Sequence, residues 1–197
     1  MSLGIVGTVG RFKPVHKGHA AMLESICANA EHVYIGLGSP NKYDARNPFT
    51  PEETKEMIEA YLGERNNVSY AFLPDLGNGN LWAAEAIHAL GDSDVLVTNN
   101  QYVSGLLAPF YNISSPSEFN GQDDSISASE VRRRMANGLN WEELVPPAVV
   151  DYIVKNGLNK RLKNEFRDET NVLYGFGDLT NRSSETEKER IQRSVKC

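Results

Sequence analysis

The segment Gly10-Arg11-Phe12-Lys13-Pro14-Val15-His16-Lys17-Gly18-His19 decides the fold class of this 197-residue chain. The apolar run at residues 4–8 is typical of a buried first strand, and apolar residues at helical spacing follow from Ala21 onward. Between a strand and a helix, backbone N–H groups and the positive end of the helix dipole point out of the edge of a doubly wound sheet. Such a loop commonly binds phosphate. The segment therefore predicts a phosphate site at this edge.

Strands and helices are expected to alternate along the rest of the chain to about residue 157. Further strands are predicted at residues 33–37, 68–73 and 94–98, and helices after Thr50 and Pro51, at 82–90, at 130–136 with Ser129 as N-cap and Gly138 as terminator, and from Pro146 or Pro147. This alternation predicts an α/β fold, a doubly wound parallel sheet of Rossmann-like type.

The length predicts one main domain, residues 1–158, followed by a charged tail, residues 159–197. The tail mixes charged residues with Gly and Ser, so we expect either a helical appendage or disorder. Ser184 and Glu187 have the spacing of a capping box. We expect the main domain to fold when the chain is cut after about Asn159.

The composition is that of an ordinary globular protein outside the membrane, with 40% hydrophobic and 23% charged residues. No apolar run approaches the roughly 20 residues that a membrane span needs. The first apolar run lacks the basic region of a secretory signal. Cys27 and Cys197 have neither a metal-ligand spacing nor a disulfide pattern, which favours a reducing cytoplasm.

Basic residues are scarce in the acidic main domain, and they are concentrated. The net charge of -6 disfavours nucleic acid as a partner. Most cations of the main domain fall in three short segments, which are Arg11, Lys13 and Lys17; Lys42 and Arg46; and Arg132, Arg133 and Arg134. This concentration predicts a local polyphosphate site.

Two histidines in the opening segment are the candidate phosphate ligands. His16 and His19 stand three residues apart where the loop becomes a helix, so both can face one pocket and donate hydrogen bonds to phosphate oxygens. Gly18 allows a phosphate to approach the backbone closely. A role in the core or on the surface is the alternative for any histidine, and we favour it for His32 and His88.

The opening segment resembles the His-x-Gly-His signature of the nucleotidyltransferase superfamily, in the form found in archaeal-type nicotinamide-mononucleotide adenylyltransferases. A second stretch, Ile126-Ser127-Ala128-Ser129-Glu130-Val131-Arg132, is similar to the Ile-Ser-x-Ser/Thr-x-x-Arg motif of that family. In the family this motif holds the β- and γ-phosphates of ATP. The alternative is a capped helix with a solvated basic face, which we favour for Arg133 and Arg134. The resemblance covers residues 4–156.

The resemblance implies the roles of the site residues. His16, His19, Lys13 and Arg132 would be catalytic by holding the triphosphate, and the ATP site would also include Gly10, Arg11, Phe12, Gly18, Thr98, Asn100, Ile126, Ser127 and Ser129. On the acceptor side, Arg46 would bind the substrate phosphate, Asp75 and Trp82 would line a pyridine pocket, and Asn78 or Asn80 would meet the carboxamide. ATP would be the co-substrate and would carry Mg²⁺ on its phosphates, because no carboxylate cluster predicts a dedicated metal cage.

The implied reaction is transfer of AMP from ATP to nicotinamide mononucleotide (NMN), which forms NAD and pyrophosphate by direct in-line attack without a covalent enzyme intermediate. This chain departs from the family at three positions: Lys13 replaces glutamine, Asn99 replaces glycine and Gly79 replaces asparagine. Two alternatives stay open, namely adenylyl or cytidylyl transfer to a phosphopantetheine or flavin precursor, and a catalytically silent nucleotide sensor. A DNA-binding regulator is disfavoured because no helix-turn-helix fits before residue 4. A homo-oligomer is left open, since the family is often oligomeric.

Overall fold

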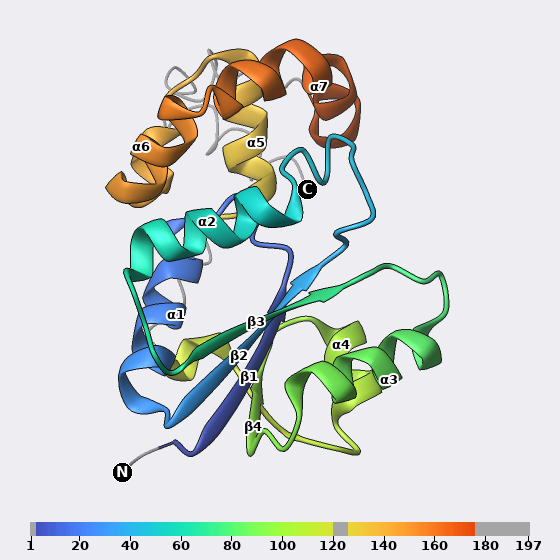
Figure 1. The fold of residues 1–197 in the computed structure, drawn as a ribbon. Coiled ribbons are helices and arrows are strands. Elements are labelled where there is room, and N and C mark those ends of the chain that lie inside the picture. Colours follow the sequence, from blue (N-terminus) through green and yellow to red (C-terminus); the bar gives the residue numbers. More distant parts are fainter. Residues whose placement is uncertain (1–2, 120–125, 176–197) are drawn as a thin grey trace, which may run out of the picture.

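A five-stranded parallel sheet in the order β3-β2-β1-β4-β5 forms the centre of the computed structural model, which describes residues 3–119 and 126–175 (Figure 1). The strands are β1 (Ile5–Gly10), β2 (His32–Gly38), β3 (Val68–Leu73), β4 (Val95–Val97) and β5 (Asn112–Ser114). The helices are α1 (Lys17–Asn29), α2 (Pro51–Leu62), α3 (Gly79–Leu90), α4 (Gln101–Leu107), α5 (Ala128–Asn137), α6 (Pro147–Lys155) and α7 (Leu158–Tyr174), with 3-10 turns η1 (Pro116–Phe119) and η2 (Glu142–Leu144). The predicted doubly wound α/β fold is confirmed.

Helices cover both faces of the sheet and create two cores. Figure 1 shows α3 and α4 on one face and α1 and α2 on the other, with α5, α6 and α7 stacked beyond α2. The larger core joins the α1 and α2 face to the later helices through residues such as Ile26, Met57 and Ile153. The smaller core joins α3 and α4 to the sheet through Leu90 and Leu107. The sheet is therefore buried between two apolar layers, as its parallel strands require.

The order of the strands reverses at β1, which positions the site. Strand β1 pairs with β2 on one side and with β4 on the other, and all these pairs are parallel. The connections from the two neighbouring strands consequently leave in opposite directions. In open α/β sheets this arrangement opens a crevice at the carboxyl ends of the strands. The His-x-Gly-His segment lies directly after β1, at that crevice.

The helix ends agree with the local sequence signals, with one correction. Thr50 caps α2 in a capping box with Glu53, and Gly138 ends α5 in the left-handed conformation, as predicted. Ser129 is not the N-cap of α5. Ser127 has the extended backbone of an N-cap and accepts the Glu130 N–H at 3.2 Å, so the helix begins two residues earlier.

The beginning of the expected tail is helix α7, and it packs as part of the main domain. Leu158 and Leu162 belong to the larger core, and Phe166 is also buried. Their spacing of four residues places them on one face of the helix, against α5 and α6. The expected boundary after residue 158 does not match this packing, because a cut there removes core residues. The expected capping box at 184–187 lies outside the described residues.

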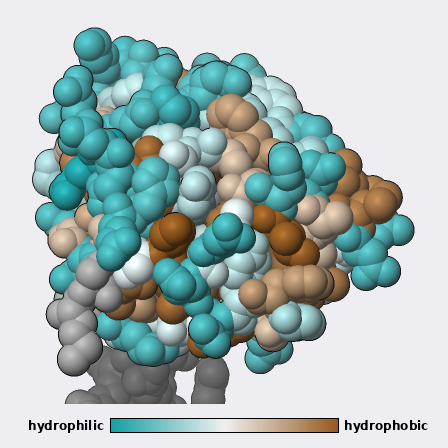
Figure 2. All heavy atoms as spheres, turned by 60° about the horizontal axis from the view of Figure 1, so that its bottom comes forward, coloured by the Kyte–Doolittle hydropathy of each residue, from teal (hydrophilic) through white to brown (hydrophobic). Residues whose placement is uncertain are grey.

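The outer surface is mixed in character. Figure 2 shows apolar side chains in small separate areas divided by polar ones, on the side of the molecule that is at the bottom of Figure 1. Exposed large residues include Leu76, Leu81 and Phe110. Scattered apolar residues of this kind are normal for a protein surface. None of the described helices is long and apolar enough to cross a membrane.

Candidate functional site

Two cavities meet at the carboxyl end of β1. The histidine cavity, about 310 Å³, is lined by Thr8, Val9, Gly10, Phe12, His16, Gly18, His19, Met22, Val97, Thr98, Asn99, Asn100, Pro116 and Ile126. The tryptophan cavity, about 440 Å³, is lined by Val9, Gly10, Arg11, Gly38, Ser39, Asp75, Gly77, Asn78, Trp82, Asn100, Tyr102 and Val103. Three residues, Val9, Gly10 and Asn100, line both. Two ligands bound in these cavities would therefore touch at the end of β1.

The two histidines lie together at the start of α1. His16 is the N-cap, and its Nδ1 accepts the backbone N–H of His19 at 3.4 Å. The rings are stacked with centroids 3.6 Å apart. Because Nδ1 of His16 accepts, the neutral ring carries its proton on Nε2. The pair thus combines a helix N-terminus with imidazole groups, which suits an anion.

His19 is held in its neutral form. Burial lowers its pKa well below 6.5, and the neighbouring His16 lowers it further, while the Pro14 carbonyl acts in the opposite direction. A bound triphosphate would favour the protonated ring and would oppose the first two effects. The site can therefore gain positive charge when an anion arrives.

Gly10 is required by the shape of the loop that follows β1. A Cβ at Gly10 would lie 2.9 Å from the Phe12 ring, which folds back over this position. Phe12 itself has a positive φ of 50°, which is rare for a residue with a side chain. The ring also contacts His19 edge-on at 5.0 Å between centroids. Gly10 thus leaves room for the Phe12 ring, and this ring packs against His19.

The opposite wall of the histidine cavity follows β4. The Thr98 hydroxyl accepts the Asn100 N–H at 3.1 Å, and Asn100 caps α4 through the Tyr102 and Val103 N–H groups. The Asn99 amide oxygen accepts a hydrogen bond from Ser115 at 2.9 Å. The three residues after β4 are therefore held by hydrogen bonds at the cavity wall. Asn99, the departure from the family's glycine, points its oxygen at Ser115.

Lys13 is a buried cation beside the site, but it lines neither cavity. Only 2% of its surface is exposed, and its Nζ donates to the Ser39 carbonyl at 3.2 Å. Burial, together with the nearby guanidinium groups of Arg11 and Arg132, lowers the pKa of Lys13 to about 8, while Asp44 acts in the opposite direction. In this structure the ammonium group therefore holds the loop after β2.

Arg132 also lies beside the cavities without lining them. Its Nη1 donates to the Lys13 carbonyl at 2.6 Å, and its Nη2 donates to the Tyr174 hydroxyl at 2.6 Å. The Nε atom is buried and has no hydrogen-bond partner in the part of the chain that the structure describes. Burial lowers the pKa of Arg132. The side chain thus links the loop after β1 to the end of α7, and its Nε–H is among the donors that remain for a ligand. Ser127 and Ser129 hydrogen-bond each other at 3.1 Å and likewise line neither cavity.

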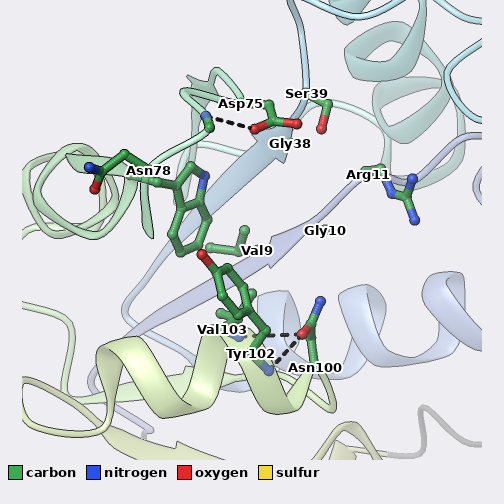
Figure 3. Close-up of a pocket in the computed structure, with 12 residues that line it drawn as sticks. Val9, Gly10, Arg11, Gly38, Ser39, Asp75, Asn78, Asn100, Tyr102 and Val103 are labelled. Carbon is green, nitrogen blue, oxygen red and sulfur yellow. Dashed lines mark hydrogen bonds between the residues drawn. The ribbon is translucent and has the colours of Figure 1, made fainter. Parts of the chain in front are cut away.

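The tryptophan cavity contains three of the five predicted acceptor residues. Asp75, Asn78 and Trp82 line it together with Arg11 (Figure 3). Asn80 lines neither cavity, because it lies on the exposed side of the first turn of α3. The Asn78 oxygen accepts the N–H groups of Asn80 at 3.0 Å and Leu81 at 3.2 Å, so it is engaged as the helix cap.

Arg46 is exposed and also lines neither cavity, yet its loop is firmly held by α7. Arg161 donates to the Pro48 carbonyl at 2.9 Å and to both Glu53 oxygens at 2.6 Å. Glu169 accepts the Ala45 N–H at 3.3 Å, and the Tyr43 hydroxyl donates to Glu165 at 2.6 Å. Helix α7 therefore fixes the loop that carries Arg46, and this loop stands outside the cavity.

Several residues at the site were not predicted from the sequence. Tyr102 lines the tryptophan cavity, and its position two residues after Asn100 was an available signal. Tyr174 is 42 residues from Arg132, and no local pattern links the two. Within residues 3–119 and 126–175, no group of three or more His, Cys, Asp or Glu could hold a metal ion.

Comparisons with known proteins point to one family. The cytidylyltransferase-like family model matches residues 8–134. A nicotinamide-nucleotide adenylyltransferase of Thermococcus sibiricus is 38% identical over 151 residues, which cover 74% of this chain and 80% of the relative. One from Methanolobus tindarius is 36% identical over 165 residues, covering 79% and 91%.

A solved structure supports the fold. A bifunctional NMN adenylyltransferase/ADP ribose pyrophosphatase from Francisella tularensis superimposes with a TM-score of 0.69 at 23% identity, over 86% of this chain. The chain spans 54% of that longer protein. The site at the end of β1, the matched family model and the archaeal relatives agree, and the chain belongs to the cytidylyltransferase-like family of nucleotidyltransferases, among the archaeal nicotinamide-nucleotide adenylyltransferases.

Proposed function

We propose that this chain transfers the AMP group of ATP to NMN, with NAD and pyrophosphate as products. The observation that carries the proposal is the meeting of two cavities at Gly10 and Asn100. One cavity offers imidazoles and a helix N-terminus, which suit a triphosphate. The other offers an indole, which suits a cationic pyridine ring. The reacting phosphates would then meet at the end of β1.

The reaction is proposed as a direct displacement. A phosphate oxygen of NMN attacks the α-phosphorus of ATP, the new P–O bond forms in line, and the bond to pyrophosphate breaks. No enzyme nucleophile takes part. This is consistent with Cys27, whose pKa is raised by burial to about 11, so its thiol stays protonated and inert. Catalysis then depends on positioning and on stabilising charge.

The roles of individual residues follow from their places. His16 and His19 would donate to oxygens of the triphosphate, while Gly18 leaves the helix N-terminus open to them. Arg11 lines the tryptophan cavity next to the shared wall, where the NMN phosphate would lie. Arg132 would act on the outer phosphates through its unused Nε or after exchanging its present partners. Mg²⁺ would enter bound to ATP phosphates, whose oxygens it prefers.

Arg46 keeps its proposed role as a ligand of the acceptor phosphate only if its side chain swings toward the cavity. Its backbone is fixed by Asp44, which accepts the Arg46 N–H at 2.8 Å. A long arginine side chain can change rotamer without moving this backbone. We also propose a reducing cytoplasm as the compartment, consistent with the buried free thiol of Cys27.

An acceptor panel tests the proposal. Pyrophosphate release is measured with ATP and, separately, NMN, phosphopantetheine and flavin mononucleotide. We expect NMN to give the highest kcat/KM and Trp82→Ala to raise its KM. A faster reaction with another acceptor would leave the ATP site intact and overturn the named substrate. Tight ATP binding without turnover of any acceptor would favour a nucleotide sensor.

A further inference from the structure

Tyr102 lines the tryptophan cavity, and its side chain has no role in the proposed reaction so far. It stands in the first turn of α4 and lines the cavity together with Trp82 (Figure 3). Its side chain is 62% exposed. Among the described residues, none forms a hydrogen bond with its hydroxyl group, although its backbone N–H is bonded to Asn100 at 3.0 Å. A polar group that faces a cavity in this way is available to a ligand.

The hydroxyl lies against α3 at a position that glycine keeps open. A Cβ added at Gly79 would overlap the Tyr102 hydroxyl, while the Cζ atom of the same ring would be at 3.4 Å, an ordinary contact. Gly79 is the first residue of α3. The absence of a side chain there therefore makes room for the oxygen of Tyr102 specifically. Figure 3 shows the ring extending from α4 into the cavity, beside Val9.

The place of the hydroxyl relative to Trp82 follows from helix geometry. Residues 79 and 82 are three apart in α3, so they lie on the same face in successive turns. A hydroxyl set against Gly79 therefore lies on the face of α3 that carries Trp82. A phenol can both donate and accept a hydrogen bond. It can consequently bind a polar substituent on an aromatic ring.

Several polar atoms near Trp82 are already engaged by the protein. The Asn78 oxygen caps α3, and Asn80 lies outside the cavity. Asp75 accepts the Gly77 N–H at 3.1 Å, and its own N–H and carbonyl are bonded to Asn41. The Tyr102 hydroxyl, which lines the same cavity and is bonded to none of the described residues, can bind a substituent of the ring.

We propose that Tyr102 is a specificity-determining residue, whose hydroxyl binds the carboxamide of the pyridine ring while Trp82 binds the face of the ring. The inference rests on the proposed function, because it concerns NMN as the acceptor. The hydroxyl donates to the carboxamide oxygen, which offers a good acceptor in the plane of the ring. Gly79 serves this role by leaving the hydroxyl in place.

The first test removes the hydroxyl. Tyr102→Phe should raise the KM for NMN about 3- to 10-fold, the usual effect of one lost neutral hydrogen bond, and leave the KM for ATP unchanged. The same variant should leave unchanged the KM for a pyridine mononucleotide that lacks the carboxamide. Tyr152→Phe, which removes a hydroxyl bonded to Glu56 on another helix, is the matched control and should behave like the wild type.

The second test is a double-mutant cycle on the contact itself. Gly79→Ala should raise the KM for NMN because its methyl group displaces the hydroxyl, whereas the same change in a Tyr102→Phe background should add little. Thermal unfolding of all variants verifies that they fold. Equal losses for NMN and the analogue without a carboxamide, or no loss for either, would overturn the inference alone. A wild-type chain that makes no NAD from NMN would overturn the proposed function and this inference with it.

Discussion

Replacing Lys13 by glutamine should stabilise the protein at neutral pH. The lysine is 2% exposed, and within residues 3–119 and 126–175 its ammonium has one hydrogen-bond partner, the Ser39 carbonyl. Burial lowers its pKa from 10.5 to about 8, so the folded chain disfavours the charged form that prevails at pH 7. Glutamine removes the charge and keeps an N–H donor that can reach the same carbonyl.

The size of the effect follows from the two pKa values. Each pKa unit corresponds to about 1.4 kcal/mol, so the lowering sets an upper bound of about 3.5 kcal/mol at pH 7. Relaxation of the surroundings and residual solvent screening reduce this figure, and we expect a gain of about 2 kcal/mol. The sign depends on pH. Below pH 8 the folded lysine carries its full cost, and between pH 8 and 10.5 the cost disappears because the folded lysine loses its proton.

Urea unfolding measures this gain. The free energy of unfolding is compared between the wild type and Lys13→Gln at pH 7 and at about pH 10. Lys17→Gln is the matched control, because Lys17 is exposed and should show no gain at either pH. An equal gain at both pH values would refute the electrostatic reasoning, and a loss at pH 7 would show that the ammonium contributes net stability.

The remaining predictions concern His19, Arg132 and α7. His19→Ala should lower kcat about 10²- to 10³-fold in the pyrophosphate assay, because one preorganised donor is worth roughly 3 to 4 kcal/mol; a wild-type rate would contradict its role. Because burial depresses the folded pKa of His19, this residue should cost the wild type up to about 1.4 kcal/mol of unfolding free energy per pH unit below 6.5, and His19→Ala should remove this contribution. In calorimetric titrations Arg132→Ala should weaken the binding of ATP more than the binding of AMP. Equal losses of affinity for the two nucleotides would assign Arg132 a structural role. Phe166→Ala should cost about 3 to 5 kcal/mol of unfolding free energy and Val172→Ala almost nothing, since Phe166 is 8% exposed and Val172 is 85% exposed; a negligible cost for both would mean that α7 is an accessory.

Local signals in the sequence predicted much of the fold. The strand and helix that flank the His-x-Gly-His segment, the Thr50 cap and the Gly138 terminator each depend on residues within one or two turns. The N-cap of α5 was misplaced because Ser127 and Ser129 are both suitable caps, although only Ser127 has glutamate three residues later. Strand β5 has three residues, too few to show a period.

The positions of the candidate site residues were predictable where they follow one strand, and the contacts between distant segments were not. His16 and His19 needed only the strand, the loop and the helix around them. Arg132 was predicted as a phosphate ligand, and its contact with Tyr174 depends on how α5 and α7 pack. The burial of Lys13 and the approach of Tyr102 to α3 are likewise results of tertiary packing. Sequence spacing carries no record of such contacts.

The hydrogen bonds between α7 and residues 43–50 have a consequence for the order of folding events during biosynthesis. A ribosome delivers the chain from its N-terminus, so the strands of the described sheet emerge before α7 does. The strands of a nascent chain can pair before Arg161, Glu165 and Glu169 are available to form hydrogen bonds with the loop around Arg46. We therefore expect this loop to reach its final form only when α7 docks.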